Sequence, residues 1–399
     1  MEEAKASSAG LEALAFRLTE RLAADAAAAG NGKNLVFSPL SIYAALALAA
    51  AGARGRTLDE LLEVLGAPSR DGLAEFVRGL AERALVDRSP AGGPSVMFAC
   101  GLWHDKTREL RPTYRAAAAE SYKAEMRAVD FHRKPKKSGK RINKWVAAAT
   151  NNLIDSILDP SSVSKQTDLI LANAIYFKGK WDVPFNKKYT KDGKFYLLDG
   201  STRKVPFMRT RMRRYIACHP GFKVLELHYG RGEVSRESPS YSMCVFLPDA
   251  RDGLPGLISD IARTPGFVSR HQPRTDVVVR AFRLPKFKIE FSRPVTGVLR
   301  DMGLELAFKQ GEADLSDMVE EDEDGRTLAL EQIVHKAVIE VNEKGTKVVA
   351  VTGGFLRGAG CKRRPRPVDF VANHPFAFFV IENRSGAIMF AGHVLDPSN

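Results

Sequence analysis

The 399-residue chain has few cysteines and no long apolar segment, and each of these absences argues against certain classes of protein. Its four cysteines are widely spaced and include no CxxC pair, which argues against a disulfide framework and a structural zinc site. The longest apolar run, around 44–51, is shorter than the ~20 residues that span a bilayer. Residues 1–20 start acidic and lack the layout of a signal peptide. We therefore expect a cytoplasmic or nuclear protein, with unconventional export still open.

The chain also lacks the local motifs of the common enzyme classes. It has no GxxxxGK[ST] phosphate loop, no HExxH zinc motif, no GxSxG nucleophile elbow and no EF-hand spacing. The glycines of 353–360 do not follow a strand and open a helix, as dinucleotide binding requires. No local motif supports a Ser/His/Asp site assembled from distant residues. We expect a protein that is not an enzyme, with no metal and no cofactor.

Ordinary composition and a clear pattern of periodicities predict a folded protein. The sequence is 44% hydrophobic and 27% charged, with a net charge of +13. Helical spacing predicts helices over 11–29, 40–51, 57–65 and 72–84. Strand patterns follow at 95–98, 169–177, 241–247, 276–282, 286–291, 334–341, 377–382 and 388–394. Because helices precede strands and no linker or repeat separates them, we expect one α+β domain over 1–399.

Three basic clusters stand out, at 132–141 (HRKPKKSGKR), 209–214 (RTRMRR) and 361–367 (CKRRPRP). The plain interpretation of each is a solvated loop or helix face. The alternative for the first cluster is a nuclear-localisation signal or a patch that binds a polyanion, and the second cluster is a further candidate for polyanion binding; the net positive charge is compatible with such a partner.

The segment around residues 334–352 carries the strongest physical argument. A buried-strand run at 334–341 ends in the turn-forming residues 342–346, and a β-prone segment, KVVAVT, follows at 347–352. An exposed β-prone segment beside a strand promotes aggregation unless it has a sheet to enter. The pattern therefore predicts a segment that can join a β-sheet.

Four segments, in the same order along the chain, resemble the serpin family, and plant serpins most closely. They are NLVFSPLSIYAALALAAAGARGRTLDEL (34–61), LANAIYFKGKWDVPF (171–185), HKAVIEVNEKGTK (335–347) and FVANHPFAFFVIENRSGAIMFAGHVLDP (370–397). The plant character comes from LLDGSTRKVPFM (197–208) and EADLSDMV (312–319).

The resemblance implies a single-domain α+β fold with a large β-sheet A, two smaller sheets, about nine helices and an exposed reactive-centre loop over about 343–369. It also implies a monomer that inhibits serine proteases, and papain-like cysteine proteases as well, as a suicide substrate. The protease cleaves the loop and is held as an acyl-enzyme while the loop inserts into sheet A. Release of a metastable native state drives this insertion.

The resemblance also assigns roles to individual residues. The shutter, a polar group under the centre of sheet A, comprises Ser38, Ser41, Asn173 and His335. The breach, where the loop first enters, comprises Lys180 and Trp181. The hinge comprises Glu343, Lys344, Gly345, Thr346, Lys347, Val348, Val349, Ala350, Val351 and Thr352.

The hinge sequence leaves two functions open. An inserted strand alternates its faces, so Thr346, Val348, Ala350 and Thr352 would point to the buried side of the sheet. Val348 stands where inhibitory serpins have alanine, and its extra methyl groups cost ~1–3 kcal/mol at a packed position. The alternative is thus a non-inhibitory serpin whose loop is cleaved without trapping, because of Val348 and Val349.

The cleaved bond is also open between two positions. The family register, counted from Gly345, places it at Ala359-Gly360, whereas the Leu-Arg pair common in plant serpins places it at Arg357-Gly358. Cys361 beside these bonds is either a reactive thiol or an inert exposed one.

Overall fold

The computed structural model describes residues 2–28, 33–232, 239–320, 327–345 and 367–398. Those residues form nine α-helices: α1 Glu2–Ala28, α2 Pro39–Ala51, α3 Gly55–Leu65, α4 Arg70–Ala84, α5 Pro112–Tyr122, α6 Pro135–Ala149, α7 Leu254–Arg263, α8 Phe267–His271 and α9 Thr296–Asp301. The strands are β1 Leu35–Phe37, β2 Ser95–Asp105, β3 Glu125–Val129, β4 Leu169–Lys178, β5 Lys191–Tyr196, β6 Thr202–Met208, β7 Arg214–His219, β8 Phe222–His228, β9 Tyr241–Pro248, β10 Asp276–Val277, β11 Val279–Pro285, β12 Phe287–Pro294, β13 Gln332–Val341, β14 Val368–Val371, β15 Phe376–Glu382 and β16 Ile388–Val394.

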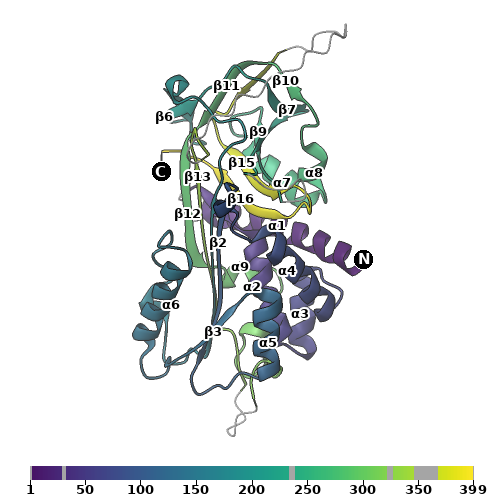
Figure 1. Cartoon of the computed structure of the whole chain (residues 1–399), viewed down its shortest axis with the longest axis vertical. Coiled ribbons are helices and arrows are strands. Elements are labelled where there is room, and N and C mark those ends of the chain that lie inside the picture. The colour runs from purple at the N-terminus through teal and green to yellow at the C-terminus, as the bar shows by residue number, and fades with distance from the viewer. Residues whose placement is uncertain (1, 29–32, 233–238, 321–326, 346–366, 399) are drawn as a thin grey trace.

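The strands form three sheets, so the α+β class and the three-sheet architecture are confirmed (Figure 1). The first has the order β12-β13-β4-β2-β3 and contains both Asn173 and His335, so it is the sheet A of the resemblance. The others have the orders β1-β16-β15-β9-β8-β7-β10 and β14-β11-β6-β5. The seven-stranded sheet has more strands, but sheet A has the longest ones, which run along the long axis of the molecule (Figure 1).

The two central strands of sheet A, β4 and β13, lie side by side and run parallel. Their register pairs 332–339 with 170–177, without a break. The outer neighbours, β2 and β12, pair antiparallel with them. We call this parallel β4–β13 contact the seam. A strand placed between its two members would be antiparallel to both if it ran back from the end of β13.

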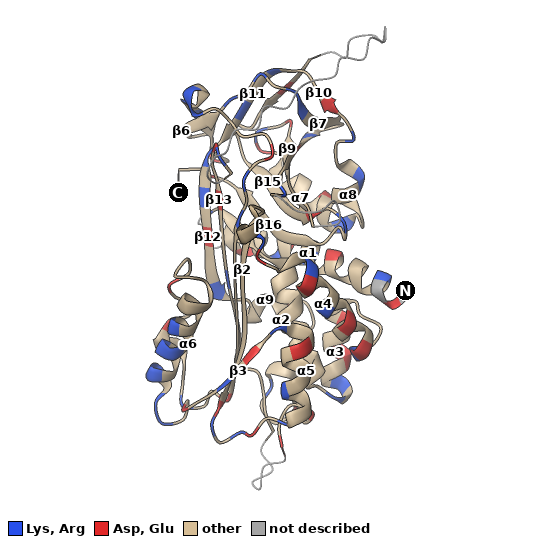
Figure 2. Cartoon of the chain, viewed as in Figure 1, with Lys and Arg blue, Asp and Glu red and all other residues tan. Residues whose placement is uncertain are grey.

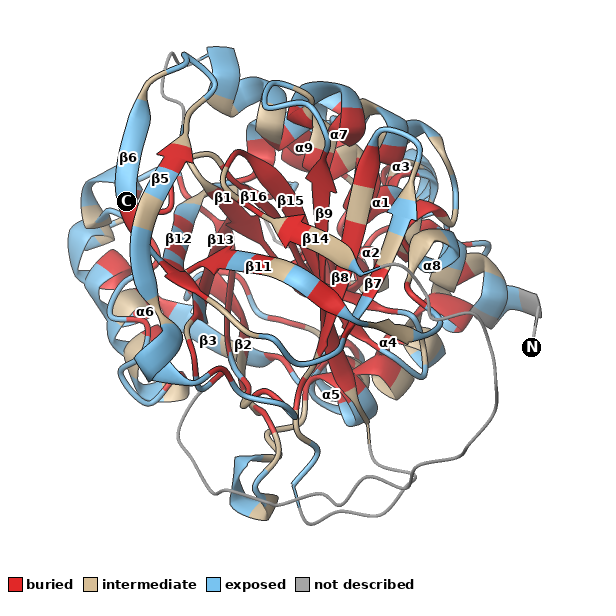
Figure 3. Cartoon of the chain, turned by 90° about the horizontal axis from the view of Figure 1, so that it is seen from above, coloured by how far each residue is buried: buried red, intermediate tan, exposed pale blue. Residues whose placement is uncertain are grey.

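Helices cover both faces of sheet A. On one side, α2 is buried almost throughout its length, as its apolar sequence predicts, with Ser38 as N-cap and Pro39 in the first turn. On the other side, α6 packs Ile142, Trp145 and Val146 on residues of β2, β4 and β13 in a separate hydrophobic cluster. Figures 1 and 3 show sheet strands enclosed by helices with exposed outer faces. The α6 cluster therefore lies across the seam.

Two sequence-based expectations differ from the structure in detail, and for a third the structure leaves a single form of two. The first helix begins at Glu2 rather than near residue 11. The basic cluster 132–141, expected as a solvated loop or helix face, has its residues 135–141 on the helix α6, whose apolar face is formed by Ile142, Trp145 and Val146. The strand expected over 276–282 is two strands, β10 and β11, which join different sheets. The chain changes its pairing partner at Val278, which is 39% exposed.

Candidate functional site at the seam of sheet A

The four predicted shutter residues meet under the centre of the seam. The N-terminal turn of α2 contacts Asn173 of β4, whose Nδ2 donates to the Ser41 carbonyl oxygen at 2.9 Å. The Ser41 hydroxyl donates to Asn173 Oδ1. The Ser38 backbone N–H donates to His335 Nε2 at 3.0 Å, and His335 Nδ1 lies 3.3 Å from Asn173 Oδ1. Asn173 and His335 are also direct partners across the seam.

The hydrogen bonds and burial of His335 fix its charge state. The side chain is fully buried, and burial lowers its pKa to about 3. Because Nε2 accepts a hydrogen bond, the neutral ring carries its proton on Nδ1, from which it donates to Asn173. A strand entering the seam would separate Asn173 from His335, so these buried groups would need new partners.

The predicted breach residue Trp181 closes the upper end of the seam. It is 4% exposed and stacks on Tyr229, with ring centroids 4.5 Å apart. Its indole Nε1 donates to the Asn342 carbonyl oxygen at 2.8 Å, and its backbone N–H donates to the Lys344 carbonyl oxygen at 3.3 Å. Trp181 thus holds the residues that immediately follow β13. The neighbouring Lys180 contributes its carbonyl oxygen, which accepts from the Gly230 N–H at 2.7 Å.

Glu343, the first hinge residue, is anchored as a buried carboxylate. The Thr190 hydroxyl donates to its Oε1 at 2.8 Å, and Lys286 Nζ lies 3.1 Å from its Oε2. Its carbonyl oxygen accepts from the Phe185 N–H at 2.8 Å. Burial by itself raises the pKa of Glu343, but hydrogen bonds from its own backbone, Thr190 and Lys286 outweigh burial and lower it. The start of the hinge is therefore held in place by several partners.

Gly345 turns the chain in the left-handed region, with φ +65°. A Cβ atom there would overlap the backbone nitrogen of Trp181 and lie 2.5 Å from the carbonyl oxygen of Gly179. Only glycine meets both the backbone angle and the close approach.

We expect Gly345→Ala to lower the free energy of unfolding by about 2–4 kcal/mol, from left-handed strain and overlap with the breach. The measurement is the guanidinium midpoint of the native state. Gly311→Ala is the matched control, since Gly311 has φ +84° and nothing within 4 Å of its Cβ position. Equal losses in the two variants would contradict a tight contact between the hinge and the breach.

The remaining predicted site residues lie outside the described residues. These are the hinge from Thr346 to Thr352, both candidate bonds (Arg357-Gly358 and Ala359-Gly360) and Cys361. Of the basic clusters, the second leads into β7, and only the last residue of the third is described.

Several contributors to the site were not predicted from the sequence. Thr190 and Lys286 bind Glu343 from 153 and 57 residues away, and Tyr229 forms the wall behind Trp181. Cys100 lies directly opposite Asn173 on β2. None of these positions carries a local signal, because each acts through a contact that only the folded chain creates.

Two properties of the described residues bear on other classes of function. Within the described ranges, no three His, Cys, Asp or Glu side chains are close enough together to hold a metal ion. Among the helices of the same ranges, none has the length and apolarity needed to cross a membrane.

Comparisons with known proteins identify the same family as the four sequence motifs. The family model described as "Serpin (serine protease inhibitor)" matches residues 9–397. Rice (Oryza sativa subsp. japonica) putative serpin-Z5 is 52% identical, covering 98% of this chain and 90% of that protein. Rice serpin-Z2A is 50% identical, covering 100% and 99%. The structure of Arabidopsis AtSerpin1, in a native stressed conformation, superposes with a TM-score of 0.91 at 37% identity and full coverage of both chains.

A three-sheet α+β fold whose central sheet has a closed parallel seam defines the class of protein. The chain belongs to the serpin family, and it is similar to plant serpin-Z proteins.

Proposed function

We propose that the protein inhibits serine proteases as a suicide substrate, with the seam as the acceptor for its cleaved loop. The observation that carries the proposal is the direct parallel pairing of β4 with β13, immediately before the hinge. The chain turns at Gly345 and re-enters the described fold before β14. A segment freed by cleavage and running back along β13 replaces one parallel ladder by two antiparallel ladders, which are more stable per residue.

The contacts that close the seam set the cost of opening it. They are the Asn173–His335 pair at its centre, the Trp181 contacts at its upper end and the α6 cluster across its outer face. In that cluster, Val334 and Val338 of β13 pack with residues 170–176 of β4. Insertion must separate these groups before it gains the new strand, so a kinetic barrier keeps the uncut chain in its native state.

The chemistry of inhibition belongs to the protease. Its active-site serine oxygen attacks the carbonyl carbon of the cleaved residue, and the new N-terminus leaves with the β14 side of the loop. Two bonds are candidates for cleavage, Ala359-Gly360 and Arg357-Gly358. They are distinguished by which residue the cleaving protease prefers before the bond. In this proposal the acid, the base and the nucleophile all belong to the protease. The contribution of the inhibitor is to move the acyl-enzyme before water hydrolyses the ester bond between the protease serine and the cleaved loop.

The alternative is a non-inhibitory serpin in which insertion is slower than deacylation. Val348 favours this alternative, because bulk at an inward position slows entry into the sheet. Trypsin, elastase and papain mixed with the chain and separated on denaturing gels distinguish the two functions. A band resistant to SDS, near the summed masses, is expected for an inhibitor, and clean cleavage alone for the alternative.

We expect Val348→Ala to increase the trapped fraction several-fold, because the inward position then carries the small residue of inhibitory serpins. Val349→Ala is the matched control, since it removes the same volume from the outward face. If both variants trap the protease to the same extent as the parent chain, the hinge valines do not limit insertion.

A polyanion is a second proposed partner, at the outer face of α6. The helix has no acidic residue, and exposed basic side chains gather on it (Figure 2). These side chains are Lys136, Lys137, Lys140, Arg141 and Lys144. One structural relative, native protease nexin-1, has a structure with heparin. Retention on immobilised heparin that weakens linearly with the logarithm of salt concentration would support this partner.

A further inference from the structure

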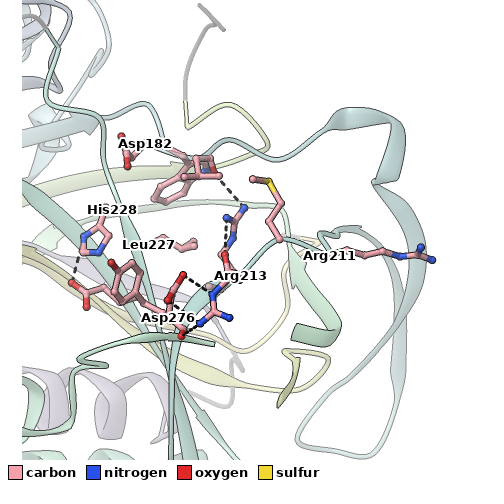
Figure 4. A pocket seen from close by; sticks show the side chains of 12 residues that line it. Asp182, Arg211, Arg213, Leu227, His228 and Asp276 are labelled. Atoms are coloured by element: carbon pink, nitrogen blue, oxygen red, sulfur yellow. Dashed lines mark hydrogen bonds and ion pairs between the residues drawn. The ribbon is translucent and has the colours of Figure 1, made fainter. Parts of the chain in front are cut away.

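A cavity of about 470 Å³ lies behind the breach, lined by Trp181 and by residues of β7 and of the edge strand β10 (Figure 4). Its lining comes from residues 181–183, 211–215 and 226–228, together with Asp276. Trp181, Met212, Tyr215 and Leu227 supply apolar surface, and three arginines supply positive charge. Met212 and Tyr215 are 48% and 38% exposed, so large apolar side chains stand unusually open here.

Arg214, in the wall of this cavity, is a buried guanidinium without an acidic partner. It is only 5% exposed, and no carboxylate of the described residues pairs with it. Its polar contacts are long ones, to the Val183 and Arg213 carbonyl oxygens at 3.3 and 3.4 Å, and its Nε has none. It also lies over the Phe185 ring at 5.0 Å. Burial lowers its pKa to about 10, so it remains charged at neutral pH.

The acidic side chains that line the cavity do not form ion pairs with Arg214. Asp276 is paired with Arg213, whose Nε lies 2.9 Å from Asp276 Oδ2 (Figure 4). Glu226 lies 3.6 Å from His228 Nδ1. Asp182 is exposed and forms no ion pair among the described residues. Asp182 and Arg211 are exposed to solvent, so Arg214 is the buried arginine of this lining that has no carboxylate partner among the described residues, although burying an unpaired charge is costly.

We propose that this cavity binds a small organic anion with an apolar body, whose carboxylate or sulfonate pairs with Arg214 while its body lies against Trp181 and Leu227. The anion supplies the charge-assisted hydrogen bonds that Arg214 lacks. The apolar walls supply the area that such a ligand buries. The site does not depend on the proposed inhibitory function, because every contact in it belongs to the uncut chain.

The three tryptophans of the chain make the test specific. Trp103 and Trp145 contact each other in the α6 cluster, whereas Trp181 lines the cavity. The full chain is labelled with ¹⁵N-tryptophan, and 1-naphthoate is added while the three indole N–H signals are followed. We expect the Trp181 signal to shift with saturation and the other two to stay. Trp181→Phe identifies the signal.

Variants and a neutral probe separate anion recognition from plain apolar binding. Arg214→Gln and replacement of the probe by 1-naphthamide are each expected to weaken binding at least about tenfold. Arg214→Lys keeps the charge and is expected to retain most of the affinity. Arg251→Gln, which removes an exposed arginine stacked on Tyr196 elsewhere, is expected to change nothing.

Three outcomes would overturn the site. They are no Trp181 shift at millimolar 1-naphthoate, equal binding of the amide, and unchanged binding by Arg214→Gln. Unmoved Trp103 and Trp145 signals in the uncomplexed variants show that each variant is folded.

Discussion

Cleavage of the loop is expected to raise the melting temperature of the chain by about 10 °C or more. A strand of about ten residues in the seam adds on the order of ten backbone hydrogen bonds, worth ~1 kcal/mol each. For a chain of 399 residues, that ~10 kcal/mol corresponds to roughly 12 °C. The measurement is differential scanning calorimetry of the intact chain and of the chain cut by elastase or trypsin.

A pair of charge substitutions shows whether insertion causes the rise. In Val348→Arg the charge falls on the inward face of the inserted strand, so burial opposes insertion and the rise should disappear. In Val349→Arg the charge falls on the outward face, so the rise should remain. If cutting leaves the melting temperature unchanged in the parent chain, the seam is not an acceptor and the inhibitory mechanism fails.

Acidification is expected to destabilise the native state through His335. Its pKa is about 3 in the fold, against an ordinary value of 6.5. Between these values the unfolded chain binds a proton that the native chain does not, so stability falls as pH falls from about 6.5 towards 3. The contribution is about 1.4 kcal/mol for each pH unit in that range. Guanidinium unfolding at pH 7, 6 and 5 measures it.

Burial lowers the pKa of other histidines as well, so a variant of His335 is needed to isolate the contribution of the shutter. Burial also lowers the pKa of His393, to about 4, and of His104 and His374. His335→Gln removes one titrating group, so its stability should fall less steeply between pH 6 and 5 than that of the parent, whatever its stability at pH 7. The same slope in both chains would mean that His335 is not buried as a neutral ring.

Local sequence was sufficient to predict β12, β13 and β4 of sheet A, whereas β2 was expected only over 95–98 and β3 was not expected at all. The apolar runs of β4 and β13 predicted buried strands, because residues covered on both faces are apolar throughout. Ser38 and Pro39 predicted the start of α2, since a capping oxygen and a missing N–H suit the first turn of any helix. The four separated motifs predicted the family, which the comparisons confirm. A single domain over 1–399 stays a prediction.

The tertiary structure alone decided how these elements form a site. The resemblance grouped His335 with Asn173, but only the structure gave the hydrogen bond between them, placed Thr190 and Lys286 on Glu343, and buried Arg214 without an acidic partner among the described residues. It also laid the basic helix α6 across the seam. Periodicity and capping act over one or two turns, so they fix what a segment becomes. Partners, burial and pKa depend on which distant segments meet, and that is set by packing of the whole chain.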